Sequence, residues 1–156
     1  MRGYTLTFAG SGGVDGAVRF APAVDEMSRW VYWAYLDLAD TGFVIVRDDE
    51  VSAPRGGSLL EVRTDGLWAE LVCETPDVHW SFGLEAFGLR LADRAEARTA
   101  VVGERVPMGF DLEWDEGAVF GELLVARDRV ELDGQGTFVT DVGPAQWADW
   151  VDSPGG

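Results

Sequence analysis

Asp37, Glu85 and Glu122 each interrupt the apolar side of a segment in which apolar and polar residues alternate. Apolar surroundings raise the pKa of a carboxyl group, which then stays protonated at neutral pH. Such a group can protonate an alkene or donate a hydrogen bond to a carbonyl oxygen. We therefore take these residues as candidate general acids. The alternative is that each one pairs with an arginine or lies at a strand end in water.

The single histidine, His79, follows the turn formed by residues 75–77. In a hairpin across this turn, Cys73 or Glu74 would lie opposite His79 at about 5 Å. Glu74 would orient the imidazole for proton transfer, whereas Cys73 would point to a thiolate nucleophile. The alternatives are a surface histidine with no catalytic role and a cysteine that only packs.

The chain carries 7 tryptophans, a high number for a small domain. Indole faces bind flat apolar ligands and stabilise cations. We expect large side chains on the strands to bind a hydrophobic small molecule. The predicted lining consists of Trp33, Tyr35, Trp68, Trp80, Phe82, Phe87, Met108, Phe110, Trp114 and Phe120. The alternative is that these rings simply fill a core.

Composition excludes several classes of function. The 156 residues suit a single domain, and the formal charge of −16 repels nucleic acid and anionic membranes. The chain contains no lysine, which removes Schiff-base chemistry and a phosphate-loop lysine. One cysteine and one histidine make an internal disulfide impossible and a zinc site implausible. We expect no metal and no cofactor.

The N-terminal segment alternates and lacks the apolar core of a signal peptide, and no apolar run approaches the roughly 20 residues that span a bilayer. The sequence therefore predicts a cytoplasmic protein that does not enter a membrane.

A period of two over most of the chain, with turns such as Asp65-Gly66, predicts consecutive half-buried strands. Closure removes the exposed edges of such a sheet, so we predict an all-β, antiparallel, lipocalin-like (calycin-type) β-barrel of about eight to ten strands with minimal helix. It forms one domain over residues 1–156, with a turn and tail from 144 to 156. The expected strands are Tyr4–Ala9, Ala17–Phe20, Arg29–Ala39, Phe43–Arg47, Leu59–Thr64, Leu67–Glu74, Val78–Leu91, Arg105–Asp115, Ala118–Ala126, Arg129–Asp133 and Thr137–Val142.

Several blocks resemble the lipocalin-like family of carotenoid 1,2-hydratases, or hydroxyneurosporene synthases, whose relatives include hydratases and Diels–Alder cyclases of secondary metabolism. The blocks are Trp30–Trp33, Gly57–Arg63, Leu67–Phe87, Gly103–Trp114 and Asp133–Gly136. Members of this family usually carry two such domains, and beyond Gly136 they continue into a strand rich in His and Trp, where this chain has Phe138, Thr140 and Asp141. We expect a homodimer to replace the second domain.

The resemblance implies an enzyme of terpenoid, polyene or polyketide biosynthesis. It would cyclise, isomerise or hydrate a substrate held in the apolar barrel, with Glu85 or Glu122 as the preferred acid and no cofactor. The alternative is a carrier that binds a hydrophobic metabolite without changing it. The segment Arg29–Ala39 is apolar on both faces, so its outer face needs a cover, either a helix of this chain or a partner subunit. Because the chain has little helix to offer, this is a second reason to expect self-association.

Overall fold

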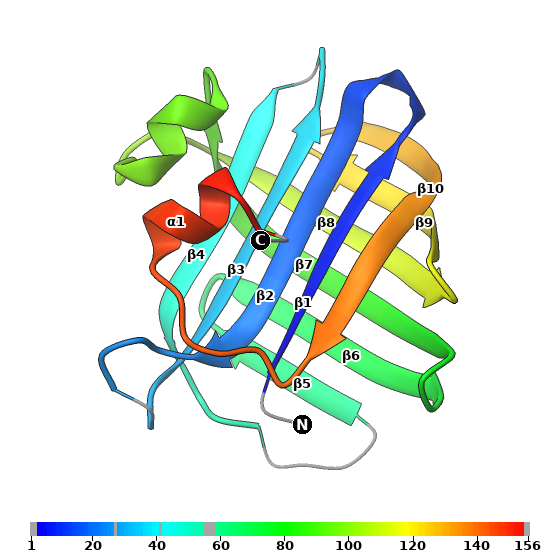
Figure 1. The fold of residues 1–156 in the computed structure, drawn as a ribbon. Helices are drawn as coiled ribbons and strands as arrows, with labels where there is room; N and C mark the ends of the chain where they lie inside the picture. The colour runs from blue at the N-terminus through cyan, green and yellow to red at the C-terminus, as the bar shows by residue number, and fades with distance from the viewer. Residues whose placement is uncertain (1–2, 27, 41, 55–58, 155–156) are drawn as a thin grey trace.

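The expected all-β class is confirmed (Figure 1). The computed structural model describes residues 3–26, 28–40, 42–54 and 59–154. Residues 57–58 of the family-like blocks and 155–156 of the expected tail lie outside this part. The elements are β1 (Tyr4–Gly10), η1 (Ser11–Gly13), β2 (Val14–Pro22), β3 (Trp30–Leu38), β4 (Phe43–Val51), β5 (Leu59–Thr64), β6 (Leu67–Thr75), β7 (His79–Leu91), η2 (Arg94–Arg98), β8 (Glu104–Asp115), β9 (Ala118–Val125), β10 (Asp128–Thr140) and α1 (Trp147–Asp152).

The 10 strands form one antiparallel sheet in the order β4-β3-β2-β1-β10-β9-β8-β7-β6-β5. The first strand, β1, pairs with the last strand, β10. A short pairing of β4 with β7 then closes the strands into a ring. The β5–β6 hairpin extends from β7 beside that ring. The fold is therefore barrel-like. The strands at the two ends of the sheet order, β4 and β5, approach each other, and we call the space between them the seam.

The closure depends on a change of partner along β7. Its first part pairs with β6 as far as Ala86, and its last part pairs with β4 from Leu89. At Gly88, between the two parts, an added Cβ would lie only 2.6 Å from Cγ1 of Val44 on β4 and 2.8 Å from the backbone oxygen of Ile45. Only a residue without a side chain lets β4 approach β7 this closely.

The strand β10 is longer than expected. Segments Arg129–Asp133 and Thr137–Val142 were predicted as two strands because glycines separate them, but β10 runs unbroken from Asp128 to Thr140. At Gly134 an added Cβ would collide with the backbone oxygen of Ala9 on β1. The glycine therefore permits close strand approach and does not form a turn.

One end of the barrel interior is filled by aromatic side chains. The ring of Phe138 lies 5.9 Å from that of Tyr4, 5.0 Å from Trp80, 5.2 Å from Phe82 and 5.7 Å from Trp114. Distances and tilts of this kind are typical of favourable ring packing. These rings pack against one another in the part of the barrel interior where we expected a ligand.

The outer face of β2, β3 and β4 carries a second apolar cluster. Its centre is Trp33, whose ring lies 5.4 Å from Trp147 and 5.6 Å from Trp150 of α1. The indole nitrogen of Trp147 donates to the backbone oxygen of Ala97 in η2, at 2.6 Å. Figure 1 shows α1 and η2 on this side of the sheet. The chain's own C-terminal helix thus covers the face from which we inferred self-association, so a homodimer stays a prediction without that support. None of the described helices has the length and apolar composition needed to cross a bilayer.

Tyrosine ionisation tests the packing. The chain has 3 tyrosines, and burial raises the pKa of Tyr4, Tyr32 and Tyr35. Groups whose folded-state pKa is raised stabilise the fold below their unfolded pKa of about 10, and this stabilisation is lost as the pH rises toward the folded value. We expect tyrosinate absorbance to appear together with alkaline unfolding followed by circular dichroism. Ionisation near pH 10 in a chain that stays folded would contradict this packing.

A matched pair of variants tests how α1 is held against the outer face of β2, β3 and β4, an arrangement that we call the cover. Trp147→Phe leaves the Ala97 oxygen without its donor, whereas Trp150→Phe removes an indole nitrogen that is buried and has no partner among the described residues. Both changes remove a similar volume. We expect Trp147→Phe to lower the free energy of unfolding by about 1 kcal/mol more than Trp150→Phe, measured in urea. Equal losses would show that the hydrogen bond does not stabilise the cover.

Candidate functional site

A hollow that several predicted site residues line lies on the outer face of the barrel, over β6, β7, β8 and β9. It has a volume of about 730 Å³. Strand register places its residues in two rows across the sheet. One row runs Glu70, Gly83, Asp111, Glu122 and continues to Glu131 on β10. We call this hollow the outer groove.

The second row of the outer groove carries the apolar side chains and one further acid. It runs from Trp68 on β6 through Glu85 and Gly109 to Leu124 on β9. Phe87 lies two residues further along β7 and is 57% exposed. The groove thus combines an indole, a phenyl ring and several carboxylates within a few strand spacings of about 4.8 Å.

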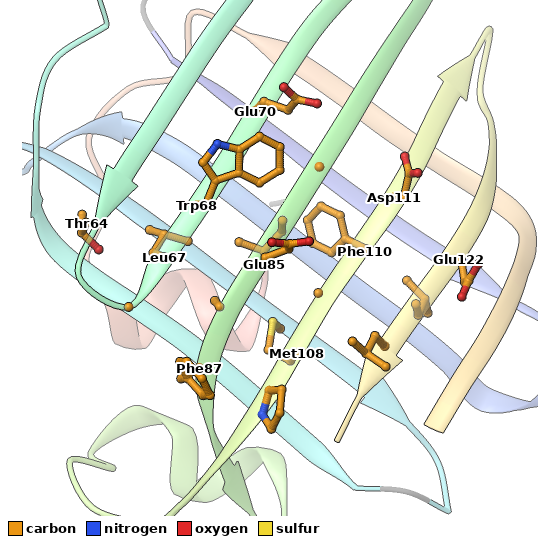
Figure 2. A pocket seen from close by; sticks show the side chains of 18 of the residues that line it. Thr64, Leu67, Trp68, Glu70, Glu85, Phe87, Met108, Phe110, Asp111 and Glu122 are labelled. Carbon is orange, nitrogen blue, oxygen red and sulfur yellow. The ribbon is translucent and has the colours of Figure 1, made fainter. Parts of the chain in front are cut away.

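Two glycines form the floor. Gly83 and Gly109 occupy outward-facing positions on β7 and β8, so the sheet is bare at these points. A Cβ added at Gly83 would lie 3.2 Å from Cγ of Glu70 and 3.6 Å from Cζ3 of Trp68, which shows that both side chains lean over this glycine. Figure 2 shows Trp68, Glu70, Glu85 and Asp111 around the same hollow.

The carboxylates of the groove are mostly uncompensated. Arg129 lies 2.5 Å from Glu122 and neutralises it. Glu70, Glu85 and Asp111 have no ion pair or side-chain hydrogen bond with any described residue, while Glu70 is half-buried and the other two are exposed. A groove of this kind attracts positive charge.

The expectation that the candidate acids are buried among apolar side chains is wrong. Glu85 is exposed, and the side chain of Glu122 is 46% exposed. Asp37 lies on the outer face of β3, in register with Phe43 of β4 and through it with Leu91 of β7, and its side chain is 32% exposed. Strand alternation placed these residues correctly on one face with their apolar neighbours, but that face is the outside of the barrel.

Arg94 of η2 forms an ion pair with Asp37. Its guanidinium lies 3.8 Å from the Asp37 carboxylate and 2.9 Å from that of Asp15, and it covers the ring of Tyr35 at 4.7 Å. Burial raises the pKa of Asp15, and the Arg94 charge opposes that rise. This cluster fixes η2 against the sheet, and none of its residues lines the outer groove.

The predicted partners of His79 are also wrong. Its Nε2 lies 2.7 Å from Oε1 of Glu113 on the neighbouring strand β8. Glu74 instead accepts a hydrogen bond from Ser81, and Cys73 pairs in register with Trp80. A register shift after Cys73, which places Thr75 opposite His79, causes the difference. Such irregularities cannot be read from the alternation pattern.

The predicted ligand-binding residues are divided among several places. Trp68, Phe87, Met108 and Phe110 border the outer groove, although Met108 and Phe110 turn their side chains into the barrel. The remaining residues lie elsewhere: Trp80, Phe82 and Trp114 in the interior, Trp33 and Tyr35 under α1, and Phe120 on the outer face of β9 at 38% exposure.

Sequence reasoning missed Glu70, Gly83, Gly109 and Asp111 as parts of a site. Asp111 is exposed, and the alternation pattern gave no indication of a groove there. The available signal was a glycine inside each of two neighbouring strands, since such glycines leave room for a ligand. Across the described residues, no group of three or more His, Cys, Asp and Glu side chains is arranged to hold a metal ion.

The chain matches no family model, no curated protein and no solved structure. The resemblance to the carotenoid 1,2-hydratase family therefore stays a prediction.

The two floor glycines should respond differently to alanine. At Gly83 the new methyl group meets only the flexible side chains of Glu70 and Trp68, whereas at Gly109 it would run into the backbone oxygen of Leu84. We expect Gly83→Ala to change the free energy of unfolding by less than about 0.5 kcal/mol and Gly109→Ala to lower it by about 2 kcal/mol or more, measured in urea. Similar losses for both variants would contradict the described floor.

Proposed function

We propose that the protein binds a small organic cation with an apolar part in the outer groove. The observation that carries the proposal is the position of the Trp68 indole among Glu70, Glu85 and Asp111, carboxylates with no positive partner among the described residues. An ammonium or guanidinium group over an indole face gains about 0.5–1 kcal/mol at an exposed site. Phe87 offers further apolar contact to the body of the ligand.

The charge of the whole chain supports the same choice of ligand. A net charge of −16 attracts cations over long distances and repels anions. A neutral polyene or terpenoid would gain from Trp68 and Phe87 but would leave the carboxylates without a counter-charge. An organic cation with an apolar part can contact the aromatic side chains and the carboxylates at the same time.

Cofactor-free catalysis is the second candidate, because Glu85 and Glu122, the preferred acids, border one groove. In this role a bound substrate would have to exclude water from Glu85 before the carboxyl group could act as a proton donor. Glu85→Gln would then abolish turnover and leave the fold intact. Cyclisation, isomerisation or hydration of a hydrophobic substrate, and transport of one in the interior, stay predictions from the sequence.

Binding can be tested with benzyltrimethylammonium and its uncharged counterpart benzyl alcohol, followed by tryptophan fluorescence. We expect the cation to bind and the alcohol to bind much more weakly. Glu85→Gln should weaken cation binding by about 1 kcal/mol, roughly fivefold, because one nearby charge is lost. Trp68→Leu should weaken it by a similar amount.

The matched control is Asp40→Asn, which removes one charge from an exposed turn between β3 and β4. Its effect on binding should be small. Equal binding of the alcohol and the cation, or an equal effect of Asp40→Asn and Glu85→Gln, would refute the proposed site.

A further inference from the structure

A second hollow opens along the seam, with a volume of about 840 Å³. One wall is residues 45–50 of β4, and the other is the turn at residues 64–67 between β5 and β6. Leu89, Val101 and Arg105 complete its lining. Val101 is 83% exposed, so the hollow has an apolar rim.

Both strands at the seam have a free edge. Within the described part of the chain, the only strand that pairs with β4 beyond Ile45 is β3, and the only strand that pairs with β5 is β6. Two backbone groups near the end of β4 have side-chain partners: the Asp49 carbonyl accepts from Arg29, and the Glu50 N–H donates to Asp48. Since β4 and β6 both run antiparallel to β7, and β5 runs antiparallel to β6, β5 is antiparallel to β4. Free strand edges present backbone N–H and C=O groups that can pair with an added extended chain.

The seam hollow is continuous with the outer groove. Both are lined by residues 64–67 and by Phe87, so they meet around the β5–β6 turn. Together they form a path from the uncompensated carboxylates near Trp68 to the free edge of β4. A small amine would occupy only the first part of this path.

We propose that the natural ligand is an extended peptide segment with a basic side chain. The inference rests on the proposed function, because the basic side chain occupies the outer groove between Trp68 and Glu85. The peptide backbone then passes Phe87 and pairs with the free edge of β4 at residues 46–51.

Charge complementarity favours a basic segment over a second copy of this chain. The β4 edge carries Asp48, Asp49 and Glu50, and Asp65 lies on the opposite wall. Arg47 already pairs with Asp49 at 3.0 Å. Pairing of this edge with the same edge of another copy would place like charges together, which destabilises a strand pair. The four carboxylates that line this hollow, at residues 48–50 and 65, outnumber its two arginines, Arg47 and Arg105, so a basic peptide meets a net negative charge.

The experiment compares three ligands by amide NMR of the labelled protein. They are the peptide acetyl-Thr-Val-Arg-Val-Thr-amide, the same peptide N-methylated at alternate amides in each of the two registers, and the single-residue compound N-acetylarginine amide. We expect the unmodified peptide to bind about tenfold more tightly than the single residue, because backbone hydrogen bonds contribute about 1 kcal/mol each. It should shift the amide signals of residues 46–51.

Methylation should remove this gain in one register and leave most of it in the other, since alternate amides along a strand face the partner. Glu85→Gln should weaken all the arginine ligands. Equal binding of both methylated peptides and the unmodified one, or no shift at residues 46–51, would overturn the peptide proposal while leaving cation binding in place. Failure of both N-acetylarginine amide and benzyltrimethylammonium to bind would instead remove the proposed function itself.

Discussion

β7 has 13 residues; one of its edges pairs first with β6 and then with β4, while its other edge pairs with β8. Both features on which the functional argument depends follow from this division. Where β7 joins β4, the sheet closes into a ring. Where β7 pairs with β6, the β5–β6 hairpin lies beside the ring, and among the described residues β5 does not pair with β4 across the seam. Gly88 marks the point of change, because a side chain there would separate β7 from β4.

The sheet separates two apolar clusters, one inside the barrel and one outside it. On the inner side, rings from β1, β7, β8 and β10 pack around Phe138. On the outer side of β2, β3 and β4, α1 and η2 cover Trp33 and its neighbours. Apolar burial on both faces of one part of the sheet stabilises that part, and the outer face over β6 to β9 is left free for a ligand.

Much of the fold was predictable because alternation and turn residues are local signals. The hairpin at Asp65-Gly66 and the long strands β7 and β8 follow directly from them. Local signals could not reveal the pairing of β4 with β7, which depends on residues far apart in sequence. They also failed after Asp133, where the expected gap between two strands is absent and Gly134 lets β10 lie close to β1.

The site was less predictable than the fold. Alternation shows which residues share a face, but it does not say whether that face is inside or outside when apolar residues occupy both. Glu85 was therefore placed with the right neighbours and on the wrong side of the barrel wall. The outer groove depends on two glycines, Gly83 and Gly109, which strand register places diagonally across β7 and β8.

The row from Glu70 through Asp111 and Glu122 to Glu131 has a consequence for ionic strength. Like charges on adjacent strands repel, and dissolved salt screens that repulsion over about 10 Å at 0.1 M. Added salt therefore stabilises this part of the sheet. The same screening weakens the attraction between these carboxylates and a cation, so salt shifts the stability of the fold and its affinity for a charged guest in opposite directions.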